Sequence, residues 1–516
     1  MRVLAVALAV ALSTSGCSFG RGGGDGERAA PFQMGLVRPA SLDPIKAGTV
    51  DEQMIAEQLF DTLVTIDPDT AEPLPGLAES WTTSDDGLRW EFQLTDATFS
   101  DGEPITAFDV EATFDRAVLR SSGSRVADLL EPVVGWREAA VDGTATELAG
   151  VTAMSDDVVA IQLTAPWGSL PSALSHPGLG VVSRADVGAA DFDDRPTGSG
   201  AYTVAERDDD RIVLRAVKGR TTKLDRIEVR LFPDQAKAYD EFAKGRLDWS
   251  PVPLSRVDEA AARYGRKYFR SYVAELFYAF NLRNPKWADA RLRVAAARAI
   301  DTKKIIDDVY AGALRPMTSL SVAGLPGAPP ATCGDLCVHD PEAAKTLLGE
   351  VTASGGTVPP ITIDFEDDAA QAAVAAQMEA DLEAVGFDVT LHPLPLDDYE
   401  RFAVSGEQDV FRLGWIAAYP AVDAFLAPLF LSGSANNLPG FALSSVDELI
   451  VQGRASTDPA ARAAAFEQAE RAIFAEAPII PIGQFQQHWV ARQPVRDLRL
   501  TVSGTFDAAS VWLAGD

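Results

Sequence analysis

Hydrophobic and polar residues alternate without interruption from residue 88 to residue 94. This period of two predicts a β-strand with one apolar face, because successive side chains of a strand point to opposite sides. The dipeptide Asp86-Gly87 just before the strand indicates a tight turn. The apolar face of the predicted strand consists of Leu88, Trp90, Phe92 and Leu94.

A helix is predicted to begin after Thr106. Thr106 is a suitable N-cap residue, and Asp109 places a carboxylate at the third helical position, near the unpaired N–H groups of the first turn. Apolar residues then recur at the spacing of one helical face. These residues are Val110, Phe114, Ala117 and Val118.

Strands and helices are predicted to mix along the rest of the chain. Residues 361–365, 369–385 and 389–391 read as strand, helix and strand, an order typical of an α/β unit with parallel strands. Residues 268–281 read as two aromatic-rich strand segments that cross between lobes. Further strands are predicted at residues 34–37, 202–206, 211–216 and 227–231, and further helices at residues 235–245 and after Asp301.

The stretch Leu77–Val110 resembles the signature of the family 5 extracytoplasmic solute-binding proteins, the peptide and nickel receptors of ATP-binding-cassette (ABC) importers. It carries Leu77-Ala78-Glu79-Ser80-Trp81 and two Asp-Gly turns at the family spacing, although Thr95-Asp96-Ala97 stands where the family usually has Arg and Gly. Weaker family patterns extend the resemblance from Phe32 to the C-terminus.

The resemblance implies an α/β fold of the type II periplasmic-binding-protein class. Such a molecule is bilobal and hinge-linked, and the large peptide-receptor subclass has an extra subdomain. The implied division is a first, discontinuous lobe in residues 32–45, 187–268 and 490–516, an extra subdomain of that lobe in residues 46–186, and a second lobe in residues 269–489.

The N-terminus reads as an export signal. Ten apolar residues, Val3–Leu12, follow Arg2, which is too few to span a bilayer but fits the h-region of a signal peptide. The ending Ser15-Gly16-Cys17 resembles a bacterial lipobox, which implies a signal in residues 1–17 and lipidation of Cys17. The alternative is an ordinary cleaved signal. The Gly-rich, charged residues 18–31 are expected to form a flexible tether.

Composition narrows the class of partner. The 516 residues provide ample core for two or three lobes, and hydrophobic and charged contents of 47% and 23% are those of a globular protein. A net charge of −30 argues against nucleic acid, whose phosphates require a basic surface. The acidity is compatible with cationic ligands, but a solvated acidic surface accounts for it more simply.

Two cysteines remain besides Cys17. Cys333 and Cys337 are separated by three residues, and in an exported protein such a pair most simply forms a disulfide that pins a loop. A metal site would require further Cys or His residues, and only His339 lies nearby in sequence. We therefore predict a disulfide and no metal site.

The segment from Asp409 to Pro420 is the strongest candidate for ligand contact. A strand runs into Gly414-Trp415 and then into a loop, a pattern that in the family resembles the cleft segment whose backbone pairs with extended peptides. Trp415 is either a ligand platform or a core residue. The resemblance implies ligand contacts from Gly414, Trp415, Ile416, Ala417, Ala418 and Tyr419.

One family feature is absent from this segment. Ala418 stands where peptide receptors have the aspartate that pairs with the ligand's α-ammonium group, which puts strong capture of a peptide N-terminus in doubt. Asp423 is a possible substitute, although a solvated loop acid is the simpler interpretation. Near the N-terminus, Gly48, Thr49 and Val50 occupy the position where family members present backbone to the ligand; an ordinary loop before a helix fits them equally well.

These features predict a receptor without catalytic residues or a cofactor. The four histidines have no ligand spacing, and no phosphate-binding glycine loop is present. We expect an exported, lipid-anchored or periplasmic monomer that binds oligopeptides or peptide-like solutes in an interlobe cleft and delivers them to an ABC permease. The alternatives are a non-peptide cargo, such as an oligosaccharide or a metal chelate, and a hydrolase or envelope protein on the same fold.

Overall fold

One large sheet runs through the whole molecule. The computed structural model describes residues 31–187, 189 and 192–514. Within them, the sheet has the strand order β15-β14-β16-β12-β17-β11-β1-β10-β9-β8, and β13 pairs with β17. Its 11 strands are β1 (Phe32–Val37), β8 (Tyr202–Arg207), β9 (Arg211–Ala216), β10 (Arg226–Phe232), β11 (Trp249–Pro251), β12 (Phe269–Phe280), β13 (Leu314–Pro316), β14 (Ile361–Glu366), β15 (Val389–Leu394), β16 (Val410–Ile416) and β17 (Ile479–Ala491).

The predicted signal and Cys17 lie outside the described residues, as does the predicted tether except for its last residue. The helices are α1 (Val50–Leu59), α2 (Ala107–Val118), α3 (Leu170–Ala173), α4 (Gln235–Ala243), α5 (Val257–Tyr264), α6 (Ala290–Ala299), α7 (Thr302–Tyr310), α8 (Pro341–Ala353), α9 (Ala369–Val385), α10 (Leu396–Ala403), α11 (Asp423–Phe430), α12 (Ser444–Ala455) and α13 (Pro459–Glu476). None of these helices is both long and apolar enough to cross a membrane.

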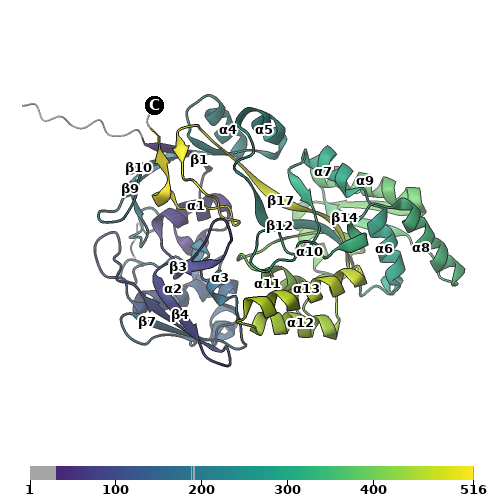
Figure 1. The fold of residues 1–516 in the computed structure, drawn as a ribbon, viewed down its shortest axis with the longest axis horizontal. Helices are drawn as coiled ribbons and strands as arrows, with labels where there is room; N and C mark the ends of the chain where they lie inside the picture. Colours follow the sequence, from purple (N-terminus) through teal and green to yellow (C-terminus); the bar gives the residue numbers. More distant parts are fainter. Residues whose placement is uncertain (1–30, 188, 190–191, 515–516) are drawn as a thin grey trace, which may run out of the picture.

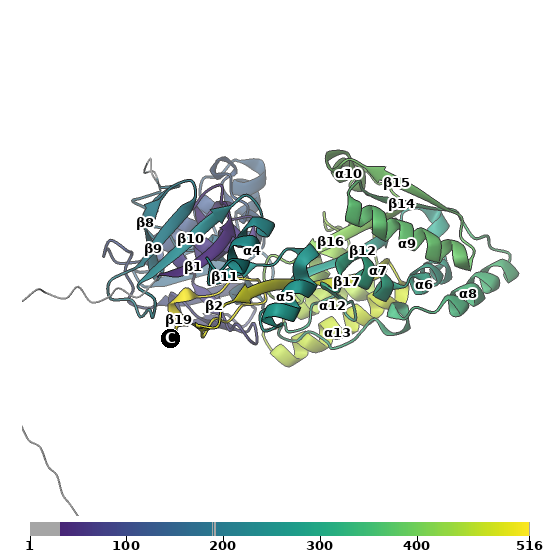
Figure 2. The same ribbon diagram turned by 90° about the horizontal axis from the view of Figure 1, so that it is seen from above.

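Two long strands connect the lobes. Figures 1 and 2 show β12 and β17 crossing from a first lobe, which carries β1 and β8–β10, to a second lobe, which carries β14–β16 and α6–α13. The two strands pair antiparallel over most of their length, and β17 continues beside β11. The predicted crossover at residues 268–281 is one strand rather than two segments. Its register against β17 shifts between Ser271 and Glu275.

The second lobe contains the predicted β-α-β unit. β14 and β15 are parallel neighbours, and α9 connects them. The first lobe contains the predicted hairpin of β8 and β9, with β10 antiparallel to β9 and parallel to β1. Asp301 caps α7 as expected, since its carboxylate accepts a hydrogen bond from the backbone N–H of Lys304 at 2.9 Å. Periodicity therefore located these elements correctly.

A four-stranded sheet in the order β4-β5-β7-β6 forms the centre of a smaller unit. Trp90, Phe92 and Leu94 of β5 are buried in its core beside the apolar face of α2, as the alternation predicted. The Asp109 carboxylate accepts the backbone N–H of Thr106 at 3.0 Å, so the first turn of α2 is capped. The remaining strands are β2 (Val64–Ile66), β3 (Pro73–Pro75), β4 (Ala78–Thr83), β5 (Arg89–Leu94), β6 (Val151–Ala153), β7 (Val158–Gln162), β18 (Val495–Arg496) and β19 (Trp512–Leu513).

The smaller unit also contacts the second lobe, at Gly168. The N–H of Gly168 donates to the carbonyl of Arg454 at 2.7 Å, and its own carbonyl accepts from Arg462 at 3.2 Å. A Cβ atom at this position would lie 2.2 Å from the carbonyl oxygen of Ser456, so only glycine allows this approach.

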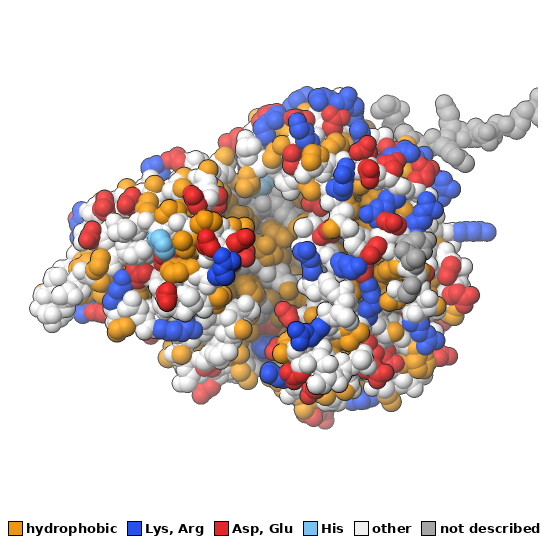
Figure 3. All heavy atoms as spheres, turned by 180° about the vertical axis from the view of Figure 1, so that it is seen from behind, with side chains coloured by type: hydrophobic (Ala, Val, Ile, Leu, Met, Phe, Trp, Pro, Cys, Tyr) orange, Lys and Arg blue, Asp and Glu red, His pale blue; other side chains and the backbone are white. Residues whose placement is uncertain are grey.

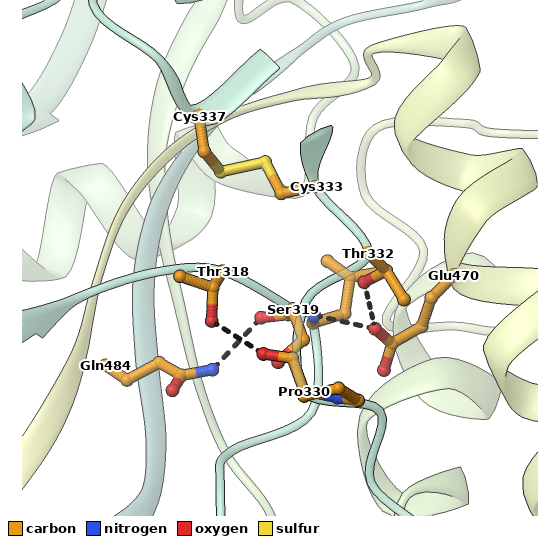
Figure 4. Close-up of a disulfide and its surroundings, with 9 residues drawn as sticks. Thr318, Ser319, Pro330, Thr332, Cys333, Cys337, Glu470 and Gln484 are labelled. Atoms are coloured by element: carbon orange, nitrogen blue, oxygen red, sulfur yellow. Dashed lines mark hydrogen bonds between the residues drawn. A yellow bond between two sulfur atoms is a disulfide. The ribbon is translucent and has the colours of Figure 1, made fainter. Parts of the chain in front are cut away.

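Cys333 and Cys337 form the predicted disulfide, with their Cα atoms 5.7 Å apart. Figure 4 shows the bond at the end of a loop that also approaches α13. There the buried carboxylate of Glu470 accepts hydrogen bonds from Thr332 at 2.6 Å and from the hydroxyl of Ser321 at 2.6 Å. The loop is therefore held both covalently and by a buried acceptor.

Candidate functional site

A cavity of about 410 Å³ lies between the two lobes. The first lobe contributes the start of α1, Gln235 and the segment after β11, while β12, β16 and β17 supply the opposite wall and the floor. Figure 3 shows the molecule hollowed between the lobes, with hydrophobic side chains in the depth of the hollow. The lining residues are Val50, Asp51, Gln235, Pro251, Val252, Leu254, Tyr272, Ala274, Glu275, Arg412, Gly414, Trp415, Ile416, Phe485, Gln486, Gln487, His488 and Trp489.

The end of β16 forms part of this wall, and three of the predicted contact residues lie there. Gly414 has no side chain to cover the floor, and a Cβ atom would lie 3.0 Å from the carbonyl oxygen of Glu275. Trp415 is half-buried, and its indole N–H donates to the carbonyl of Ala424 at 2.6 Å, which fixes the ring. Ile416 is 63% exposed, a high value for a large apolar side chain, and it faces the cavity.

One edge of β16 is open beside the cavity. β12 pairs with β16 along residues 410–416, but β14 pairs with it only at Val410 and Phe411. Residues 412–416 therefore have no strand on their outer side among the described residues. Backbone N–H and C=O groups on such an edge are available to a further extended chain. The carbonyl of Arg412 is an exception, because it accepts a hydrogen bond from the hydroxyl of Tyr399.

The loop after β16 turns away from the cavity. Ala417 is buried, and its N–H donates to the carbonyl of Val273 at 2.8 Å. Ala418 is exposed but does not line the cavity. The Tyr419 hydroxyl donates to the Asp423 carboxylate at 2.9 Å, and burial together with this neighbouring charge raises the pKa of Tyr419 well above its usual value.

Asp423 is fully buried and does not line the cavity either. Besides Tyr419, its carboxylate accepts the indole N–H of Trp167 at 2.9 Å, and the Arg454 guanidinium lies 3.7 Å away. Trp167 belongs to the smaller unit, adjacent to Gly168. In this arrangement Asp423 connects that unit to the second lobe, rather than acting as the solvated loop acid considered from the sequence.

Of residues 48–50, only Val50 reaches the cavity. Gly48 and Thr49 donate their backbone N–H groups to the Glu52 carboxylate at 2.9 and 3.0 Å, which completes a capping box at the start of α1. A Cβ atom at Gly48 would meet Arg125 at 2.5 Å, so this glycine packs against the smaller unit. The N–H groups of both residues are thus already occupied.

Several residues that line the cavity were not predicted from the sequence. Arg412 could have been found, because strand alternation places it on the same face as Gly414 and Ile416. Its guanidinium lies 3.5 Å from the Glu366 carboxylate. The aromatic residues Tyr272, Phe485 and Trp489 come from the two connecting strands and carried no local signal.

His488 and Glu275 are among the buried titratable groups that line the cavity. Burial lowers the pKa of His488 to about 4, so its imidazole is neutral at pH 7. Glu275 is 1% exposed, and burial, followed by the nearby Glu470 carboxylate, raises its pKa well above the usual value. Neither carboxylate oxygen of Glu275 has a hydrogen-bond partner among the described residues.

The family model described as bacterial extracellular solute-binding proteins, family 5 Middle, matches residues 72–437. The chain belongs to this family. It is 26% identical over 486 residues to the periplasmic murein peptide-binding protein MppA of Escherichia coli (strain K12), and the alignment covers 89% of each chain. It is also 26% identical over 465 residues to the periplasmic oligopeptide-binding protein OppA of that strain, covering 86% of this chain and 84% of OppA.

Solved structures of family 5 proteins share the fold. The unliganded open form of the murein tripeptide-binding protein MppA superposes with a TM-score of 0.83 at 23% identity, covering 95% of this chain and 98% of MppA. The predicted type II, bilobal α/β fold is therefore confirmed. Both relatives named above are periplasmic peptide-binding proteins, and the family is one of extracellular solute-binding proteins.

Proposed function

We propose that this protein is the extracytoplasmic receptor of an ABC importer and that it binds oligopeptides or peptide-like solutes in the interlobe cavity. The observation that carries the proposal is the open edge of β16 at residues 412–416, which borders the cavity. An extended peptide placed there would add a strand to the sheet, and its backbone would supply the missing hydrogen bonds. Backbone pairing is indifferent to side chains, which suits a receptor of broad specificity.

The cavity residues take complementary roles in this proposal. Gly414, Trp415, Ile416 and Val50 contact the ligand, and the Arg412 guanidinium provides a cation for a carboxylate at one end. Ala417, Ala418 and Tyr419 support the wall from behind. The remaining apolar and aromatic lining accommodates ligand side chains, as in most small-ligand sites.

Delivery requires movement of the lobes and attachment to the membrane. β12 and β17 are suited to act as hinge strands, so that ligand binding would favour a closed form that docks on the permease. We propose lipidation of Cys17 as the membrane anchor. The lobe division proposed from the sequence, with residues 269–489 as the second lobe, follows the same hinge.

Ligand-dependent thermal stabilisation tests the proposal. Pools of tri- to pentapeptides should raise the melting temperature, because a ligand that binds only the folded protein stabilises it by RT ln(1 + [L]/Kd). The same peptides with N-methylated backbone amides should stabilise less, since they cannot donate to an open strand edge. Stabilisation by oligosaccharide or metal-chelate pools alone would favour the rival cargoes. Equal stabilisation by methylated and unmethylated peptides would contradict pairing along β16.

A further inference from the structure

Asp51 is an acidic residue on the first-lobe side of the cavity. It lies in the first turn of α1, next to Val50, and its side chain is largely buried, with 8% of the residue exposed. Oδ1 accepts the backbone N–H of Val37 at 2.9 Å, which ties the end of β1 to α1 and fixes the carboxylate. The apolar residues Val50, Val252 and Leu254 line the same side of the cavity.

No positive charge accompanies this carboxylate. Among the described residues, no Lys, Arg or His nitrogen lies within 4 Å of Asp51, and no side chain donates a hydrogen bond to it. The nearest charge that acts on it is Glu52, which is also negative. Burial outweighs the Val37 hydrogen bond and raises the pKa of Asp51 to about 6. Asp51 is thus ionised at pH 7 but lacks a counter-ion.

Other acids of the region do not offer such a group. Asp423 is sealed between Trp167 and Tyr419, outside the cavity. Both carboxylate oxygens of Glu275 are buried, and the raised pKa of Glu275 indicates a neutral side chain. Ala418 carries no charge. The basic residues of the lining are Arg412, whose guanidinium neighbours Glu366, and His488, which is neutral at pH 7.

We infer that Asp51 is the anchor for a protonated amine of the ligand, placed on the first lobe rather than on the β16 wall. This inference rests on the proposed receptor function and narrows its cargo to solutes that carry an ammonium group beside apolar side chains. A buried, fixed and uncompensated carboxylate gains most from such a partner, because the ligand cation replaces the solvation that burial removed. The α-ammonium group of a peptide and the side chain of a lysine both have this chemistry.

The test measures binding of three apolar pentapeptide pools by isothermal titration calorimetry. The first pool has free N-termini, the second is N-acetylated, and the third is N-acetylated and contains one lysine. At pH 7.5 the wild-type protein should bind the first pool at least about tenfold more tightly than the second, as expected for a buried charge pair. Asp51→Asn should bind both pools alike. The third pool shows which amine the protein recognises. An affinity equal to that of the first pool indicates that a lysine side chain suffices, and an affinity equal to that of the second pool indicates that the α-ammonium group is required.

Asp258→Asn is the matched control, because it removes an exposed carboxylate of α5 outside the cavity, and it should keep the wild-type preference. A measurement on the wild-type protein alone accompanies the variants. Lowering the pH from 7.5 to 5 should weaken binding of the first pool and not of the second. The acetylated pool is the reference for other effects of pH, because the neighbouring groups Glu52, Glu275, His488 and Arg412 are the same for both pools.

The two proposals fail in different ways. If wild-type protein binds free and acetylated pools equally, or if Asp51→Asn retains the preference, the role of Asp51 is refuted while peptide binding stands. If no pool binds to the wild-type protein, the receptor function for peptides is refuted, and the inference falls with it.

Discussion

Replacement of Asp51 by Asn should stabilise the unliganded protein at alkaline pH and not in acid. The pKa of Asp51 is raised from 3.8 to about 6 in the folded protein. Protonation of Asp51 therefore contributes to the free energy of unfolding, because the folded state binds the proton more tightly than the unfolded state does. This contribution is fully present below about pH 4 and is lost as the pH rises through 6. A difference of about 2 pKa units corresponds to about 3 kcal/mol. Asparagine keeps an oxygen that accepts the Val37 N–H, and it carries no charge.

The assay is urea unfolding of both proteins at pH 4 and pH 8, followed by tryptophan fluorescence. The free energy of unfolding of Asp51→Asn, relative to the wild type, should rise by about 3 kcal/mol between the two pH values. Glu52→Gln is the matched control, because the Glu52 carboxylate accepts backbone N–H groups of Ala40, Gly48 and Thr49. It should destabilise the protein at pH 8 by about 1–3 kcal/mol.

The opposite result would refute the reasoning. If Asp51 merely stabilises the first turn of α1, as an acid near a helix N-terminus ordinarily does, its replacement should destabilise the protein more at pH 8 than at pH 4. A pH-independent difference would show that the carboxylate is adequately solvated in the open cavity.

Two further perturbations address the contact between the smaller unit and the second lobe and the disulfide of the second lobe. Gly168→Ala should destabilise the protein by about 1–3 kcal/mol in thermal or urea unfolding, because the new Cβ atom would lie 2.2 Å from the Ser456 carbonyl oxygen. Gly349→Ala in α8 is the control. Its Cβ atom would meet nothing within 4 Å, so this variant should be neutral or stabilising. Replacing both Cys333 and Cys337 by serine should lower the free energy of unfolding by about 2 kcal/mol, because the disulfide closes only a short loop of the unfolded chain. The replacement should leave peptide affinity unchanged, since neither residue lines the cavity.

Local patterns predicted the elements well where one face of each is buried. The alternation in β5, the capping of α2 by Asp109 and the parallel pair β14 and β15 depend on residues close in sequence. The hydrogen bond between Trp167 and Asp423 joins residues 256 positions apart and could not be predicted in this way. From the sequence, Asp423 resembled a surface acid because nothing in its neighbourhood indicates that a tryptophan covers it.

The candidate site was predictable only in part for the same reason. The Gly414-Trp415 segment has a local signature, but the cavity also takes residues from α1, from the segment after β11 and from both connecting strands. These segments meet only when β17 returns beside β12 and β11. Aromatic residues such as Tyr272 and Phe485 look like ordinary strand residues until that pairing exposes them to the gap between the lobes.

Asp51 and Glu52 illustrate what separates a structural residue from a functional one in this protein. Both are acids in the first turn of α1, and both satisfy the same helix-terminus preference. Glu52 uses its carboxylate to hold three backbone N–H groups, so its charge is compensated within the fold. Asp51 holds one, beside a largely apolar cavity, and retains a charge that the fold leaves uncompensated. A sequence that keeps such a destabilising group at the mouth of a binding cavity is consistent with a ligand that completes the pair.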